Sequence, residues 1–125
     1  MEYELTWGGD AEDLFIRTSG SATVPEMNAM VEKVLADEHF RAGLKVLVDH
    51  REAGFTGFTT EHLRKRADQA AWQLRQGKPS KVAIVVGRDI FVVAGRLLES
   101  FIRARTSIAF RTFRTVEDAR AWIVS

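Results

Sequence analysis

Apolar and polar residues alternate near the N-terminus of the chain, a pattern typical of β-strands. The alternation runs through residues 3–7, stops at Gly8-Gly9-Asp10, and resumes at residues 14–16. Paired glycines followed by aspartate favour a tight turn between two such segments. We therefore expect the chain to begin with a β-hairpin.

Four later segments have helical spacing and helix-end signals. Thr23 and Glu26 have the spacing of a capping box, with Pro25 in the first turn. Thr59 and Thr60 suit the start of a second helix, which Gly77-Lys78-Pro79 ends. A third helix is expected from residue 89 to about residue 103, and a short fourth helix follows Thr115. The apolar stripes of the first and second helices are Met27, Met30, Val31, Val34 and Leu35, and Leu63, Ala67, Ala70, Ala71 and Leu74.

Three further segments, residues 44–49, 81–87 and 108–113, are rich in β-branched and aromatic residues and have strand length. The first two are almost continuously apolar, as in parallel strands buried on both faces. The resulting order is ββαβαβαβα. We expect one α/β domain over residues 1–125, with a mixed, mostly parallel five-stranded sheet and helices on both faces.

Composition narrows the class of protein. The chain has 125 residues, 46% of them apolar and 28% charged, which is typical of a globular domain. Cysteine is absent, so disulfides, thiolate metal sites and cysteine nucleophiles are excluded. The first residues are acidic, unlike a signal peptide, and apolar runs such as residues 82–86 are far too short to span a bilayer. These features favour a cytoplasmic protein.

Charge is distributed unevenly along the chain. Residues 1–62 carry a net charge of −7 and residues 63–125 a net charge of +8. Such asymmetry can mark an anionic partner, but arginine-rich helices that solvate their outer faces explain it equally simply. The longest basic run is only Arg64-Lys65-Arg66, so we do not expect nucleic-acid binding.

Polar residues follow the predicted parallel strands, where ligands of open α/β sheets gather. The candidates for a polar or anionic site are Asp49, His50, Arg51 and Arg88. A structural alternative is that Arg88 pairs with Asp49 or Asp89. No nucleophile, paired acid or metal-ligand spacing accompanies His50, so we expect no enzyme activity, no bound metal and no cofactor.

The third helix has more apolar residues than one buried face requires. Phe91, Leu98 and Ile102 are therefore candidates for contact with a partner subunit or an apolar ligand. The alternative is that this helix lies centrally on the sheet, with the terminal helix against its other flank. The second helix is lined with alanine, and Phe55 and Phe58 lie in the segment before it, which is expected to be a turn. An unused apolar helix face favours a homodimer.

The element order and three sequence patterns resemble the SpoIIAA-like family, which includes STAS domains and is related to Sec14-type lipid-binding domains. The patterns are Leu47-Val48-Asp49, residues 81–85, and a closing strand Phe110-Arg111-Thr112-Phe113 followed by Val116-Glu117-Asp118-Ala119 and Trp122-Ile123. The resemblance covers essentially the whole chain.

The resemblance implies a non-enzymatic protein-interaction or signalling module of the bacterial cytosol. An alternative that it also implies is a small carrier that holds a lipid or other apolar ligand between the second and third helices. STAS domains of the anti-sigma-factor antagonist type carry a phosphorylated Ser in an Asp-Ser-[Ser/Thr]-Gly motif. This chain has Thr59 and Thr60 at that place without the flanking Asp and Gly, and both residues can also be explained as helix N-caps.

Overall fold

A computed structural model describes residues 1–56 and 59–125 of the chain. Its element order is β1 (Glu2–Trp7), β2 (Leu14–Ala22), α1 (Val24–Ala36), β3 (Lys45–Phe55), α2 (Thr60–Gly77), β4 (Lys81–Val85), α3 (Asp89–Arg105), β5 (Ala109–Phe113) and α4 (Val116–Ile123). The predicted ββαβαβαβα order is confirmed. Among the described residues, no helix combines the length and apolarity needed to cross a membrane.

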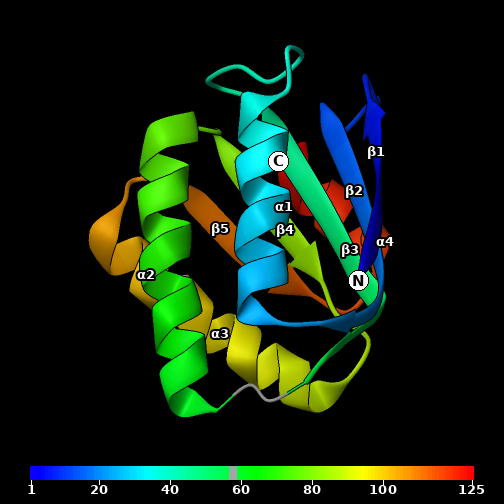
Figure 1. The fold of residues 1–125 in the computed structure, drawn as a ribbon. Helices are drawn as coiled ribbons and strands as arrows, with labels where there is room; N and C mark the ends of the chain where they lie inside the picture. The colour runs from blue at the N-terminus through cyan, green and yellow to red at the C-terminus, as the bar shows by residue number, and fades with distance from the viewer. Residues whose placement is uncertain (57–58) are drawn as a thin grey trace.

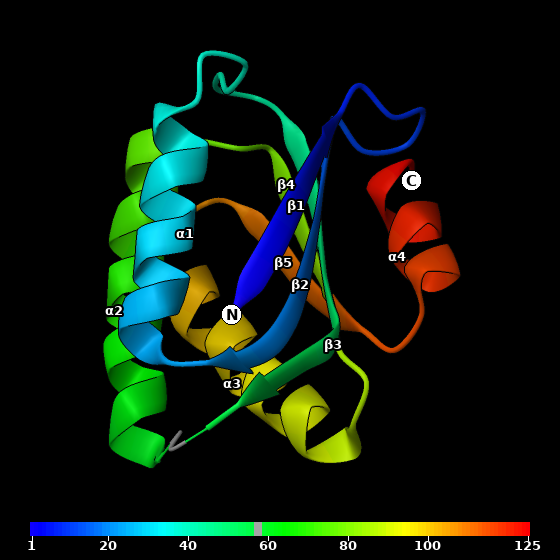
Figure 2. The same cartoon turned by 45° about the vertical axis from the view of Figure 1, so that its right-hand side comes forward.

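The five strands lie in the sheet in the same order as in the sequence (Figure 1). β1 pairs antiparallel with β2, and the remaining neighbours are parallel. Connections between neighbouring parallel strands are right-handed. Because β3, β4 and β5 each lie on the same side of the preceding strand, the helices that connect them all lie on one face of the sheet. α1, α2 and α3 accordingly cover one face and α4 the other (Figure 2).

Side-chain caps begin three of the four helices at the residues that the sequence predicts. Thr23 and Glu26 form a complete capping box on α1. The Thr59 and Thr115 hydroxyls accept backbone N–H bonds from His62 and Asp118. Each such cap contributes about 1 kcal/mol, so these helix starts are encoded locally.

The end of α2 is set by a close approach between helices. A Cβ on Gly77 would lie 2.4 Å from a methyl carbon of Leu35, so a larger residue here would require the Leu35 side chain to move. Gly77 itself stays helical, and Lys78 takes the left-handed cap conformation at φ 53°. α1 and α2 can therefore meet closely at this end.

α3 is fixed on β5 by a second close approach. A Cβ on Gly95 would lie 2.5 Å and 2.6 Å from the side-chain atoms Oγ1 and Cγ2 of Thr112. One turn further on, the buried Glu99 carboxylate accepts the backbone N–H of Thr112. This contact satisfies a donor on the outer edge of β5.

Two apolar clusters lie on opposite faces of the sheet. The larger one joins α1 to β2, β3 and β4, and includes Leu14, Ile16, Met30 and Val34. The smaller one lies under α4, and includes Leu47, Val85, Ala119 and Ile123. β3 and β4 contribute to both clusters, as expected for central strands buried on both faces.

β3 is longer than the sequence predicts. It runs through Phe55, so residues 54 and 55, for which the sequence predicts a turn, belong to the strand. β2 continues beside this second half of β3, and the two strands pair as far as Ala22 and Phe55. This half of β3 contains polar and glycine residues, so it lacks the apolar pattern of a buried strand. Pairing with β2 stabilises it in the strand conformation.

Candidate functional site

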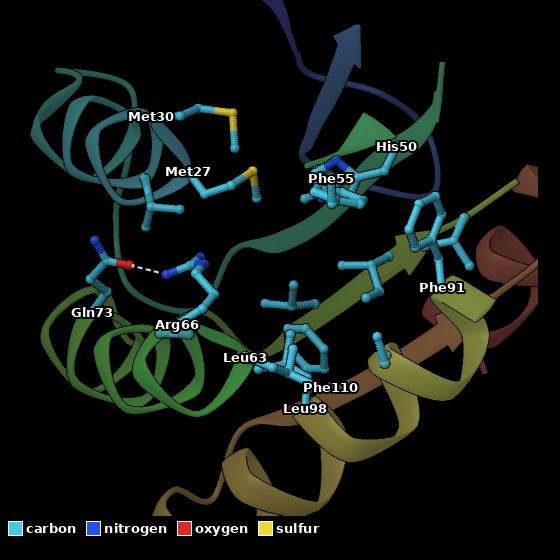
Figure 3. A pocket seen from close by; sticks show the side chains of 18 of the residues that line it. Met27, Met30, His50, Phe55, Leu63, Arg66, Gln73, Phe91, Leu98 and Phe110 are labelled. Atoms are coloured by element: carbon cyan, nitrogen blue, oxygen red, sulfur yellow. Dashed lines mark hydrogen bonds between the residues drawn. The ribbon is translucent and has the colours of Figure 1, made fainter. Parts of the chain in front are cut away.

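A pocket of about 420 Å³ lies between the sheet and the three helices on its larger covered face. Figure 3 shows it between Met27 and Met30 of α1, Arg66 of α2 and Phe91 of α3, with His50 and Phe55 on the sheet side. The volume is in the range of small-molecule sites in proteins, and most of the lining side chains are apolar.

The floor of the pocket comes from alternate residues of the parallel strands. Val46 and Val48 of β3 and Val82 and Ile84 of β4 point to this face, because successive side chains of a strand alternate. Phe110 of β5 closes the floor on the far side. The hydrophobic strands thus build a smooth apolar surface under the helices.

A β-bulge turns the end of β3 toward the pocket. Arg17 aligns with Asp49 and Ser19 with Glu52, so β3 has one residue more than β2 between these pairs. In a regular strand His50 and Phe55, five residues apart, would face opposite sides. The extra residue reverses the alternation, and both side chains line the pocket.

Three of the five residues predicted for an apolar interface or pocket line this one, namely Phe55, Phe91 and Leu98. Ile102 does not line it and is fully buried. Phe58 lies outside the described residues. Of the alanine stripe on α2, Ala70 borders the pocket, and Ala67 and Ala71 are buried beside it.

A buried arginine is the most polar group in the pocket wall. Arg66 is only 9% exposed, and its Nη1 donates to Asn28 Oδ1 and to Gln73 Oε1, both at 3.0 Å. Gln73 Nε2 in turn donates to the carbonyl of Asn28 at 3.1 Å. Burial lowers the pKa of Arg66 to about 10, so the guanidinium remains charged at neutral pH.

His50 is the second buried polar group of the pocket. Its Nδ1 lies 2.6 Å from the Thr18 hydroxyl, which also donates to the carbonyl of Asp49. Burial, together with the positive charge of Arg66, lowers the pKa of His50 to about 4, against a smaller opposite effect of Asp49. The imidazole is therefore neutral at neutral pH.

An aromatic row connects His50 to the start of α3. The His50 and Phe55 rings meet edge to face at 5.3 Å, and Phe55 meets Phe91 in the same way at 5.1 Å. The guanidinium of Arg88 lies over the Phe91 ring at 5.9 Å. Edge-to-face contacts fix these rings at one side of the pocket.

The four residues predicted for a polar strand-end site do not converge. The Asp49 carboxylate and Arg51 form a bidentate pair at 2.9 Å and 2.8 Å, on the sheet face opposite to His50. Burial alone would raise the pKa of Asp49, but the hydrogen bonds and charge of Arg51 outweigh it and lower that pKa. Arg88 is the exposed N-cap residue of α3, and Asp89 pairs with Arg114.

Thr59 and Thr60 are both exposed at the start of α2. The Thr59 side chain caps the helix, as the structural interpretation predicts, and Thr60 is the first helical residue. Across residues 1–56 and 59–125, no three acidic or histidine side chains are grouped as metal ligands.

Arg66 and Gln73 are not among the site residues predicted above. A signal was available, because Leu63, Arg66, Ala70 and Gln73 follow one another at intervals of three and four residues. Such spacing places all four on one helix face, so two polar residues interrupt an apolar stripe. Polar residues at such positions are expected to be buried and hydrogen-bonded.

Comparison with known proteins gives one family. A family model described as SpoIIAA-like matches residues 14–124. A crystal structure of an uncharacterised protein of the DUF3478 family from Shewanella loihica PV-4, described as having a SpoIIAA-like fold, is similar with a TM-score of 0.62 and 18% identity. The alignment covers 97% of this chain and 93% of that one, and at this identity it shows a shared fold. A search of curated proteins found no match. The chain belongs to the SpoIIAA-like family.

Proposed function

We propose that the protein is a non-enzymatic binding protein that holds a small apolar or amphiphilic molecule in the pocket under α1, α2 and α3. The pocket carries this proposal, because its floor and most of its walls are apolar and its volume suits a ligand. Exposed Ile90 and Val93 border it at the surface, which supplies an apolar entrance.

Filling the pocket is expected to abolish binding of the neutral apolar dye phenylnaphthylamine. Ala70→Phe adds a ring to a wall residue that is 4% exposed, so the new side chain occupies ligand space. Dye fluorescence should rise with the unaltered protein and stay low with the variant. Leu63→Trp, at another part of the wall, should act in the same way.

The matched control is Ala121→Phe, which adds the same ring to an exposed position of α4 on the other face of the sheet. This variant should bind the dye normally, and circular dichroism should show that all variants are folded. Failure of the unaltered protein to bind, or undiminished binding by both filled variants, would rule out the pocket as a ligand site.

A second candidate function is protein interaction through a second copy of the chain. Ile90, Val93 and Leu97, here called the α3 ridge, are 65%, 63% and 47% exposed. Their spacing places them along one side of the helix. An exposed row of apolar side chains favours association between protein molecules. In a symmetric dimer, the α3 ridge of one copy would cover the α3 ridge of the other.

Val93→Asp is expected to convert a dimer into a monomer in sedimentation equilibrium, because it places a charge at the centre of the α3 ridge. Stability should change little, since the residue is exposed. Val124→Asp, at an exposed position after α4, serves as the control and should leave the dimer intact. A monomeric unaltered protein would refute self-association.

A further inference from the structure

Arg66 carries a positive charge inside a pocket that is otherwise largely apolar. The residue is only 9% exposed, and across the described residues no carboxylate lies within salt-bridge distance of it. Burial is the cause of its lowered pKa, with no acidic side chain opposing that effect. Burying a charge without a counter-ion is costly. Arg66 is such a charge, because the described part of the chain provides it with no acidic partner.

The neutral partners of Arg66 use only one of its nitrogens. Both amide contacts, from Asn28 and Gln73, are made by Nη1. Nε and Nη2 hold three more N–H donors, for which residues 1–56 and 59–125 provide no hydrogen-bond partner, and neither nitrogen is a fully buried unpaired atom. Because Gln73 also binds the carbonyl of Asn28, the two amides hold the guanidinium in one orientation. Figure 3 shows the bond between Gln73 and Arg66. The Nε and Nη2 edge of the guanidinium is thus held in position to donate hydrogen bonds to a ligand.

Resting on the ligand-binding function proposed above, the structure assigns a class of ligand. We propose that the pocket binds a single-chain amphiphile whose anionic head group, a carboxylate or a phosphate, pairs with the guanidinium of Arg66. Oxyanions match the arginine fork with two parallel hydrogen bonds. The chain then lies on the apolar floor formed by β3, β4 and β5.

The neighbouring polar group and the pocket size agree with this class. His50 is neutral at neutral pH, so Arg66 supplies the positive charge of the pocket. A volume of about 420 Å³ lies within the range of pockets that hold small organic ligands. A medium-length chain such as that of decanoic acid fits this size.

The first test uses the unaltered protein and two ligands with the same chain. Decanoate and decanol compete with phenylnaphthylamine at neutral pH, and decanoate is expected to displace the dye at a concentration at least about tenfold lower. Decyl phosphate forms a third arm, and its rank against decanoate shows which oxyanion fits better. A preference for either anion over decanol supports the assignment.

The second test removes the charge. In Arg66→Met, decanoate should lose its advantage over decanol, whereas Arg66→Lys, which keeps the charge without the fork, should retain part of it. Arg64→Met removes the same charge from an exposed position of α2 and should retain the full preference. A merely structural Arg66 would alter thermal stability and leave the preference for the anion unchanged.

The two proposals fail in different ways. If decanol displaces the dye as well as decanoate and decyl phosphate do, the anionic ligand class is refuted and the apolar pocket stands. If Arg66→Met keeps the anion preference, Arg66 is not the head-group site. If neither the dye nor any of the three ligands binds the unaltered protein, both the ligand class and the binding function are refuted.

Discussion

Ile102→Ala is expected to lower the free energy of unfolding by about 2–5 kcal/mol, the range for removing a fully buried aliphatic side chain. Ile102 has no exposed surface and does not line the pocket. Truncation therefore leaves a cavity on the sheet side of α3, which is held in place by Gly95 and Glu99 and cannot move in to fill it. Urea unfolding followed by tryptophan fluorescence measures the loss.

Leu97→Ala on the same helix is the matched comparison. Leu97 is 47% exposed, so this change should cost less than about 0.5 kcal/mol. Equal effects of the two variants would show that Ile102 does not belong to the core. A change of oligomeric state in Ile102→Ala without any loss of stability would support its assignment to an interface instead.

Lowering the pH from about 6.5 to about 4 is expected to remove about 3 kcal/mol of stability through His50 alone. The unfolded chain takes up a proton on this imidazole near pH 6.5, whereas burial keeps it neutral in the folded protein until about pH 4. Between these values the unfolded state binds more protons, so acid favours unfolding. The contribution is fully present above pH 6.5.

His50→Gln removes this titration and can still form a hydrogen bond with Thr18. Its unfolding free energy should therefore be much flatter over the same pH range, while the loss at lower pH from carboxylates such as Glu12 should remain. His39→Gln, at an exposed histidine, should retain the full acid sensitivity. An identical pH dependence in the His50 variant would contradict burial as the cause of the low pKa.

Local sequence signals determined most of the fold. Thr23, Thr59 and Thr115 mark helix starts by their own hydrogen bonds, and alternation or continuous apolarity marks the strands. These features involve residues close together in the sequence, so they can be recognised without a structure. The second half of β3 is not predictable in this way, because its stability comes from pairing with β2, which no local pattern reveals.

The candidate site was predictable only in part. The apolar surplus of α3 indicated a pocket or an interface, but it could not assign Phe91 to the pocket, Ile102 to the core and Val93 to the surface. That assignment depends on the angle at which α3 crosses the sheet. The close approach of Gly95 to Thr112 restricts this angle, and it joins a helix residue to a residue of β5, which the apolar pattern of α3 alone does not reveal.

The strand-end hypothesis depended on a feature that this sheet does not have. Ligands collect at strand ends where the strand order reverses and neighbouring crossovers diverge to opposite faces. Here the strands follow one another in sequence order, so α1, α2 and α3 stay together on one face. Asp49 and His50 are adjacent in sequence and are separated by the plane of the sheet.

The contact between Glu99 and Thr112 also bears on aggregation. A sheet grows into a fibre when a strand of another molecule pairs with an open edge. At β5 the Thr112 N–H is already occupied by a side chain of α3. At the opposite edge, β1 presents the exposed side chains of Glu2 and Glu4. An identical β1 strand would bring like charges face to face, so both edges of the sheet oppose polymerisation.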